Sequence, residues 1–397
     1  MFAAGPAAAG NGVAITGIEV TQAIQNLQHQ VRLIAGKKTV VRVYLEPRGL
    51  TSNVRISGEI MVSKSPGTPG TFIGSMNQIS LKATGHPSMK DQRNDIETSL
   101  NFLIPAPVAG PMTVRFTRAI AMAGGDVVPL LPGSEEVSVG FDAGVPFRVR
   151  ALGLRYKNTL VNPPTEISPA ATHFDHLRSF LTRAYPVPAL DWTQAVIPAD
   201  ENFVPPFKGT PLPNGFDPHW WALIGIVHVQ LMAIRQEDID AGWDPRTHYY
   251  GLVADDAGFF RGAANDVPAS PAPGTVAVGP VGRPDASFWD KDGSYGDWYG
   301  AHELAHTFGR RHPGFCNQSH DDAAYPYPGG RISDAAQDFI GLDVGDAALG
   351  LPMRTCPHTE WHDVMTYCTN QWISKYTYDG IFDRLVAEDT QFAPPTV

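Results

Sequence analysis

The sequence predicts a protein of two domains, an antiparallel β-sandwich followed by a mixed α and β domain. Its 397 residues exceed the length at which a single hydrophobic core usually stops growing. Up to about residue 145 apolar and polar residues alternate in short runs, and beyond it segments with strand and helix periodicity follow one another. We therefore expect a flexible N-terminus at residues 1–12, the sandwich at 13–145 and the second domain at 146–390.

The first domain is expected to be immunoglobulin-like. Period-two alternation indicates strands with one buried face at residues 39–45, 54–62, 100–104, 112–116 and 137–141. Gly and Pro residues bound these runs, as is typical of turns between strands. Several short strands in succession favour a sandwich of two antiparallel sheets.

The second domain combines strands with helices. A strand is expected at residues 147–154 and a helix at 171–184, where Phe174, Leu177 and Leu181 recur at helical spacing. Further strands are expected at 195–197 and 249–253, separated by a helix from about 222 to 238. This order is typical of an α+β domain.

The net charge and the hydrophobicity of the sequence argue against two classes of function, nucleic-acid binding and membrane insertion. The net charge is -10 and no block of Lys or Arg occurs, so we expect no nucleic-acid partner. No apolar stretch approaches the roughly 18 residues of a transmembrane helix, so we expect no membrane insertion. The content of 39 Gly and 35 Pro predicts a loop-rich fold.

The number and positions of the cysteines indicate the cellular compartment in which the protein is expected to function. Cys316, Cys356 and Cys368 all lie in the last quarter of the chain, and one disulfide with one free thiol is the simplest arrangement. A Cys316–Cys368 and a Cys316–Cys356 bridge are both open, and either favours an oxidising compartment over three reduced thiols in the cytosol. The N-terminus lacks the basic residues of an intact signal peptide.

The segment from His302 to His312 contains the candidate metal-binding and catalytic residues. His302 and His306 are four residues apart, so on a helix they lie on one face and can bind one metal ion. Glu303 is placed to act as general base on a water molecule without being a ligand. The sequence therefore predicts half of a zinc site on a helix.

A third histidine completes the predicted site. His312 lies ten residues after His302, on a different helical face, but Gly309 can adopt the left-handed conformation that ends a helix. The chain can then turn and bring His312 to the ion. Three histidines leave a fourth position open, as in catalytic rather than structural zinc sites.

A methionine motif follows about fifty residues later. Met365 and Tyr367 lie in the stretch Asp-Val-Met-Thr-Tyr-Cys, which looks like the Met-turn that forms an apolar floor beneath a three-histidine site. With the H-E-x-x-H-x-x-G-x-x-H motif, residues from about 147 to 385 resemble the metzincin clan of zinc endopeptidases. Within the clan, this segment most closely resembles secreted bacterial members. That resemblance rests on two stretches, Tyr-Pro-Tyr-Pro-Gly-Gly from Tyr325 and Trp-Ile-Ser-Lys-Tyr-Thr-Tyr from Trp372.

The resemblance implies a fold, a mechanism and a location. It implies a twisted mixed sheet, an active-site helix, a single catalytic zinc ion and hydrolysis of peptide bonds in protein substrates outside the cell. Tyr367 stands where a tyrosine steadies the tetrahedral intermediate in astacin-like and serralysin-like members, although its ring could serve packing instead. Gly309 and Met365 would be structural.

Other interpretations remain open at this level. The chain could be a secreted or surface binding protein with a metzincin fold and little hydrolysis, or a zinc amidohydrolase acting on non-peptide amides. Asp290 and Asp292 lie in a short motif with the flavour of a calcium loop, but the distal Glu of an EF-hand is missing. An edge strand at 258–264 or 274–280 is expected to bind a peptide substrate by strand addition. Nothing in the sequence indicates the oligomeric state.

Overall fold

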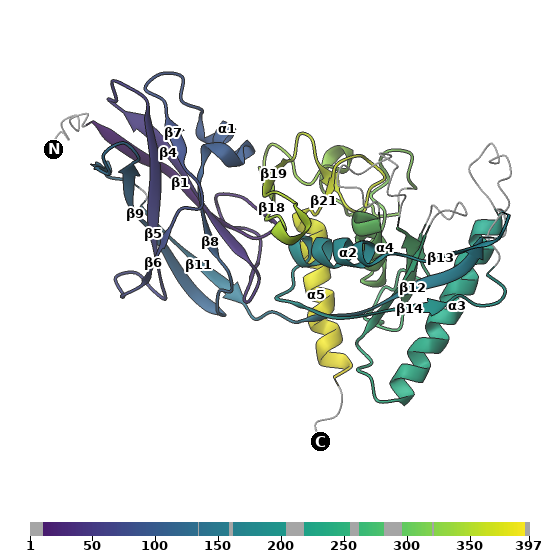
Figure 1. The fold of residues 1–397 in the computed structure, drawn as a ribbon. Helices are drawn as coiled ribbons and strands as arrows, with labels where there is room; N and C mark the ends of the chain where they lie inside the picture. Colours follow the sequence, from purple (N-terminus) through teal and green to yellow (C-terminus); the bar gives the residue numbers. More distant parts are fainter. Residues whose placement is uncertain are drawn as a thin grey trace. The chain divides into compact units, whose positions relative to one another are not determined.

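The structure is a computed structural model that describes residues 11–133, 135–158, 162–203, 218–254, 262–281, 296–319 and 321–393. The first ten residues of the expected flexible N-terminus lie outside this set. The chain divides into two compact units. Unit 1 contains residues 1–144, 333–345 and 352–358, and unit 2 contains 145–332, 346–351 and 359–397. The protein is of mixed α and β type (Figure 1).

Unit 1 holds two sheets that share one core. The smaller has the order β1 (Gly12–Thr21), β4 (Thr39–Arg48) and β8 (Leu100–Ile104). The larger has the order β3 (Leu33–Ile34), β11 (Glu136–Asp142), β9 (Gly110–Ala121), β5 (Val54–Ser63) and β6 (Thr71–Gly74), with β10 (Val127–Val128) on β9 and β7 (Ile79–Leu81) on β5. All pairs are antiparallel except β3 with β11. Alternate residues of both sheets, such as Val41 and Phe116, are buried in the same cluster.

A third sheet in unit 1 joins distant parts of the chain. It has the order β19 (Arg354–Pro357), β18 (Ile340–Asp343) and β2 (Ile24–Gln25). Next to it lie the short helix α1 (Met89–Asn94) and the 3-10 turn η1 (Ile96–Thr98). Arg93 of α1 is buried and forms ion pairs with Glu19, at 2.8 Å, and with Asp338. Residues that follow the histidine motif thus complete the N-terminal unit.

Unit 2 is built on a mixed sheet. Its strands follow the order β13 (Thr165–Ile167), β12 (Phe147–Asn158), β15 (His248–Val253), β17 (Val276–Pro280) and β16 (Ala263–Ala264), with β14 (Leu190–Pro198) also on β12. The pairs of β12 with β14, β12 with β15 and β15 with β17 are parallel. The pairs of β13 with β12 and β16 with β17 are antiparallel. The expected strands 147–154 and 249–253 lie within β12 and β15.

Helices cover both faces of this sheet. They are α2 (Ala171–Ala184), which has the expected bounds, α3 (Pro218–Asp240), α4 (Gly296–Thr307) and α5 (Lys375–Gln391). On β15, Gly251 faces Val227 and Leu231 of α3, while the neighbouring Tyr250 reaches Gly300 of α4. Because successive strand residues point to opposite faces, α3 and α4 lie on opposite sides of the sheet (Figure 1).

The rest of unit 2 is short or irregular. It includes the 3-10 turns η3 (Pro328–Gly330) and η4 (Ala347–Leu349) and the two-stranded sheet of β20 (His362–Asp363) and β21 (Gln371–Trp372). Within the described ranges, no helix is both long and apolar enough to cross a membrane.

Candidate metal centre

Two of the three histidines come from the buried helix α4. His302 and His306 are one helical turn apart, with 2% and 6% of their surfaces exposed. Gly300 lets the helix approach its neighbours, because a Cβ there would lie 2.7 Å from Leu177 of α2 and 3.1 Å from the hydroxyl of Tyr250. The close fit holds this helix firmly and so determines where both imidazoles point.

The end of α4 is a glycine-capped turn. Gly309 has φ of 74°, its N–H donates to the carbonyl of His306 at 2.8 Å, and the N–H of Arg310 donates to that of Ala305 at 3.1 Å. These two bonds define a Schellman motif, in which the residue after the helix is left-handed. The chain therefore reverses at Gly309 and returns His312 to the helix.

The three imidazoles converge through their Nε2 atoms. Nε2 of His312 lies 3.2 Å from Nε2 of His302 and 3.0 Å from that of His306. Zinc–nitrogen bonds of about 2.0–2.1 Å in a tetrahedron would separate the nitrogens by about 3.3 Å. The donor set therefore fits one small metal ion, and within the described part of the chain these three side chains form the one group so arranged.

The outward nitrogen of each ring has a hydrogen-bond acceptor. Nδ1 of His302 donates to the carbonyl of Val364 at 2.8 Å, and Nδ1 of His306 donates to that of Arg310 at 2.6 Å. Nδ1 of His312 faces the carboxylate of Asp321 at 3.4 Å. With the protons on Nδ1, the Nε2 lone pairs all point to the centre, as metal binding requires.

Burial favours the neutral form of these histidines. It lowers the pKa of His306 to about 3, lowers that of His302 well below its usual value, and lowers that of His312 as well. Neutral imidazole is the form that binds metal. The site is therefore ready to bind a cation at neutral pH without first losing protons.

Glu303 lies beside the histidines on the side of the sheet edge. Only 3% of its surface is exposed, and burial raises its pKa to about 8, opposed by a hydrogen bond from the backbone of Ala264 in β16. A Cβ on Gly262 would come within 2.9 Å of the Glu303 side chain. A carboxyl group with a pKa near neutrality is suited to accept and return a proton.

The predicted Met-turn adjoins the histidines. Met365 is buried, with 1% of its surface exposed, and follows Val364, whose carbonyl accepts the hydrogen bond from His302. The ring centroid of Tyr367 lies 5.8 Å from that of His302 and 5.3 Å from that of His312, and 42% of the Tyr367 surface is exposed. The structure therefore places the partly exposed ring of Tyr367 beside two of the three histidines.

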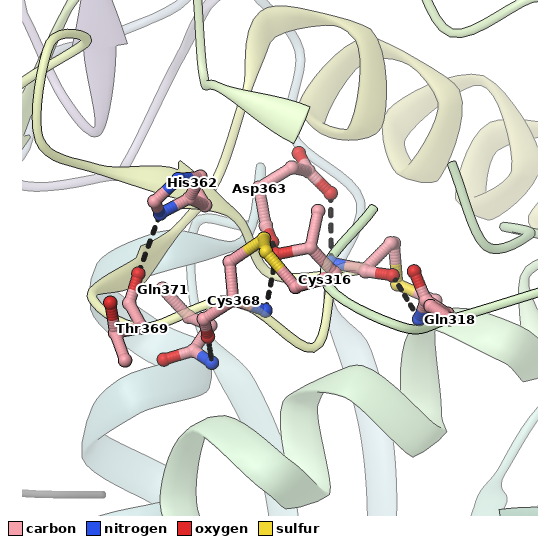
Figure 2. Close-up of a disulfide and its surroundings, with 9 residues drawn as sticks. Cys316, Gln318, His362, Asp363, Cys368, Thr369 and Gln371 are labelled. Carbon is pink, nitrogen blue, oxygen red and sulfur yellow. Dashed lines mark hydrogen bonds between the residues drawn. A yellow bond between two sulfur atoms is a disulfide. The ribbon is translucent and has the colours of Figure 1, made fainter. Parts of the chain in front are cut away.

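A disulfide joins the two segments of the site. Cys316 is bonded to Cys368, and the side-chain amide of Gln318 donates to the carbonyl of Met365 at 2.8 Å, in the region shown in Figure 2. Of the two pairings left open by the sequence, the structure shows Cys316–Cys368. Cys356, in β19 of unit 1, is buried and takes no part in this disulfide.

Two of the expected features lie wholly or partly outside the described residues. The calcium motif with Asp290 and Asp292, and residues 258–261 of one candidate edge strand, lie outside the described residues. The described part of the edge is β16, which pairs with β17 (Val276–Pro280). β17 itself lies inside the sheet, between β15 and β16, so the alternative at 274–280 is not an edge strand.

Sequence reasoning missed the groups that hold the histidine rings. Val364 and Arg310 act through backbone carbonyls, which every residue carries, so their identities give no signal. Asp321 was detectable in principle, as an acidic residue shortly after the third histidine. No family model matches the chain, and no curated protein matches its sequence. The residues of the candidate site are therefore the features of this chain that bear on its function.

Proposed function

We propose that the protein is a zinc-dependent endopeptidase of the metzincin type. The observation that carries the proposal is the convergence of three Nε2 atoms beside a buried glutamate. Three nitrogen donors with an open fourth position favour a catalytic zinc ion. The mixed sheet, the glycine-capped helix and the Met-turn segment support a metzincin fold, and the two sheets with one core support an N-terminal immunoglobulin-like sandwich.

Each residue has a part in the proposed reaction. His302, His306 and His312 hold the ion, which when bound supplies a Lewis acid that acidifies water and polarises a carbonyl group. Glu303 takes the proton from the attacking water and delivers it to the leaving amine. Tyr367 donates a hydrogen bond to the substrate oxygen as negative charge develops.

Peptide substrates would bind along the sheet edge. β16 runs next to Glu303, and an extended peptide could add to it as a further strand. The Cys316–Cys368 disulfide supports a secreted or extracellular location, because such bonds persist in oxidising compartments.

The decisive experiment compares wild type with Glu303→Gln on a peptide library, with zinc content measured in parallel. We expect the variant to keep one zinc ion per chain and to lose about 10²- to 10⁴-fold in turnover, because Gln cannot accept the proton. Glu237→Gln, at an exposed position of α3, is the control and should behave as wild type.

Three outcomes would contradict the proposal. If the Glu303→Gln variant cleaved peptides at the full wild-type rate, Glu303 could not be the general base. Zinc binding by wild type without cleavage of any peptide would favour the binding-protein alternative. Cleavage of non-peptide amides alone would favour the amidohydrolase alternative.

A further inference from the structure

The segment that follows His312 folds back onto it. The backbone N–H groups of Asp321 and Asp322 both donate to the carbonyl of His312, at 3.0 and 2.8 Å. Cys316 and Asn317 have φ of 58° and 65°, which reverses the chain between these ends. The loop therefore begins and ends at the backbone of the third histidine.

The Asp321 side chain is directed at the ring of His312. Its Oδ2 lies 3.4 Å from Nδ1 of His312, and the hydroxyl of Ser319 donates to the same Oδ2 at 2.8 Å. The Ser319 hydroxyl also lies 3.5 Å from Nδ1. Ser319 thus holds the carboxylate where it can accept the outward proton of the imidazole.

The neighbouring Asp322 contacts α5 and Arg310 rather than the ring of His312. It accepts hydrogen bonds from the hydroxyl of Tyr376 at 3.1 and 3.0 Å and lies 3.8 Å from the guanidinium of Arg310. That guanidinium lies 4.6 Å from the centre of the Tyr376 ring. These contacts tie the end of the loop to α5, and so fix the backbone from which Asp321 extends.

The three histidines differ in the charge behind them. His302 and His306 are held by neutral carbonyls, whereas His312 faces a carboxylate. A carboxylate behind a metal-binding histidine orients the ring and makes its inner nitrogen a stronger donor. His312 is also the ligand that lies outside α4, so it has most need of such orientation.

We infer that Asp321 is the positioning residue of the metal centre, which orients His312 and strengthens its bond to the ion. The inference rests on the proposed metal site but not on peptide hydrolysis. The Asp321 side chain is 47% exposed, and water weakens its field. We therefore expect an effect near the lower end of the range for such partners, about 10-fold in metal affinity.

The test is the zinc affinity of full-length Asp321→Asn, measured by competition with a chromophoric chelator. We expect a loss of about 10-fold, with a shifted visible spectrum of the cobalt-substituted protein, because the ligand strength of His312 changes. Ser319→Ala should show a smaller loss in the same direction. Asp175→Asn, an exposed position on α2, is the matched control.

Several results would overturn the inference. One is a zinc affinity of Asp321→Asn within about twofold of wild type. Another is an unchanged cobalt spectrum together with a lower unfolding temperature of the metal-free variant, since that would show a structural role alone. Its failure is distinguishable from that of the proposed function, because inactivity of zinc-loaded wild type would refute peptidase activity and leave the affinity comparison intact.

Discussion

At the scale of single residues, the candidate metal centre depends on two glycines, because a side chain at either position would collide with its neighbours. Gly309 has a positive φ, and a Cβ there would lie 2.5 Å from the carbonyl oxygen of Pro268 and 2.6 Å from the Arg384 guanidinium. Gly262 similarly leaves room for Glu303. Both glycines allow a close approach: Gly309 lets the chain return His312 to α4, and Gly262 lets the Glu303 side chain lie against the sheet edge.

Gly309→Ala should damage both stability and metal binding. The left-handed conformation costs a non-glycine residue about 1–2 kcal/mol, and the contact with Pro268 adds to this. We expect a lower unfolding temperature and weaker zinc binding, measured by thermal unfolding and chelator competition. The control is Gly225→Ala in α3, where a Cβ would meet nothing within 4 Å and should be neutral or stabilising. Equal effects of the two substitutions would contradict this account.

At the scale of elements, β15 and α5 of unit 2 meet at the end of α4, the helix that carries His302 and His306. His248 of β15 lies 2.9 Å from Glu388 of α5 through Nε2 and 2.9 Å from Thr307, at the end of α4, through Nδ1. His248 and Glu388 are almost fully buried. The ring centroid of His248 also lies 4.5 Å from that of Phe308. This contact fixes the end of α4, from which the glycine turn departs.

The substitution Glu388→Ala should lower the free energy of unfolding of unit 2. It leaves the buried Nε2 of His248 without its carboxylate partner, and such a loss costs about 1–3 kcal/mol. Urea unfolding should show a lower midpoint, and Gln391→Ala, an exposed position of the same helix, should leave it unchanged. A midpoint equal to wild type for Glu388→Ala would mean that the contact contributes nothing to stability.

At the scale of the whole molecule, the chain does not divide into two consecutive pieces. Residues 333–345 and 352–358 belong to unit 1, where β18 pairs with β2 and Leu342 packs in one cluster with Val40. The sequence assigned these residues to the second domain, because their position in the chain follows the histidine motif. Their strand partner is only two residues long, too short to give a detectable pattern.

Leu342→Ala should therefore loosen unit 1 rather than unit 2. Leu342 is 1% exposed, and truncation of a buried leucine costs about 2–5 kcal/mol. Amide hydrogen exchange should accelerate in β2 and β4. Leu231→Ala, in the core of unit 2, is the matched control and should accelerate exchange in β15 and β17 instead. Faster exchange in unit 2 after Leu342→Ala would contradict the division.

What the sequence alone determined was local. The pairing of His302 with His306, the turn at Gly309 and the helix at residues 171–184 follow from helical periodicity and backbone sterics, which act over a few residues. Only the tertiary structure decided the pairing of Cys316 with Cys368, the carboxylate behind His312, the carbonyls behind His302 and His306, and the membership of β18 in unit 1. These features depend on which distant segments of the chain pack together. That packing is set by the burial of apolar surface across the whole chain, which a short sequence motif does not encode.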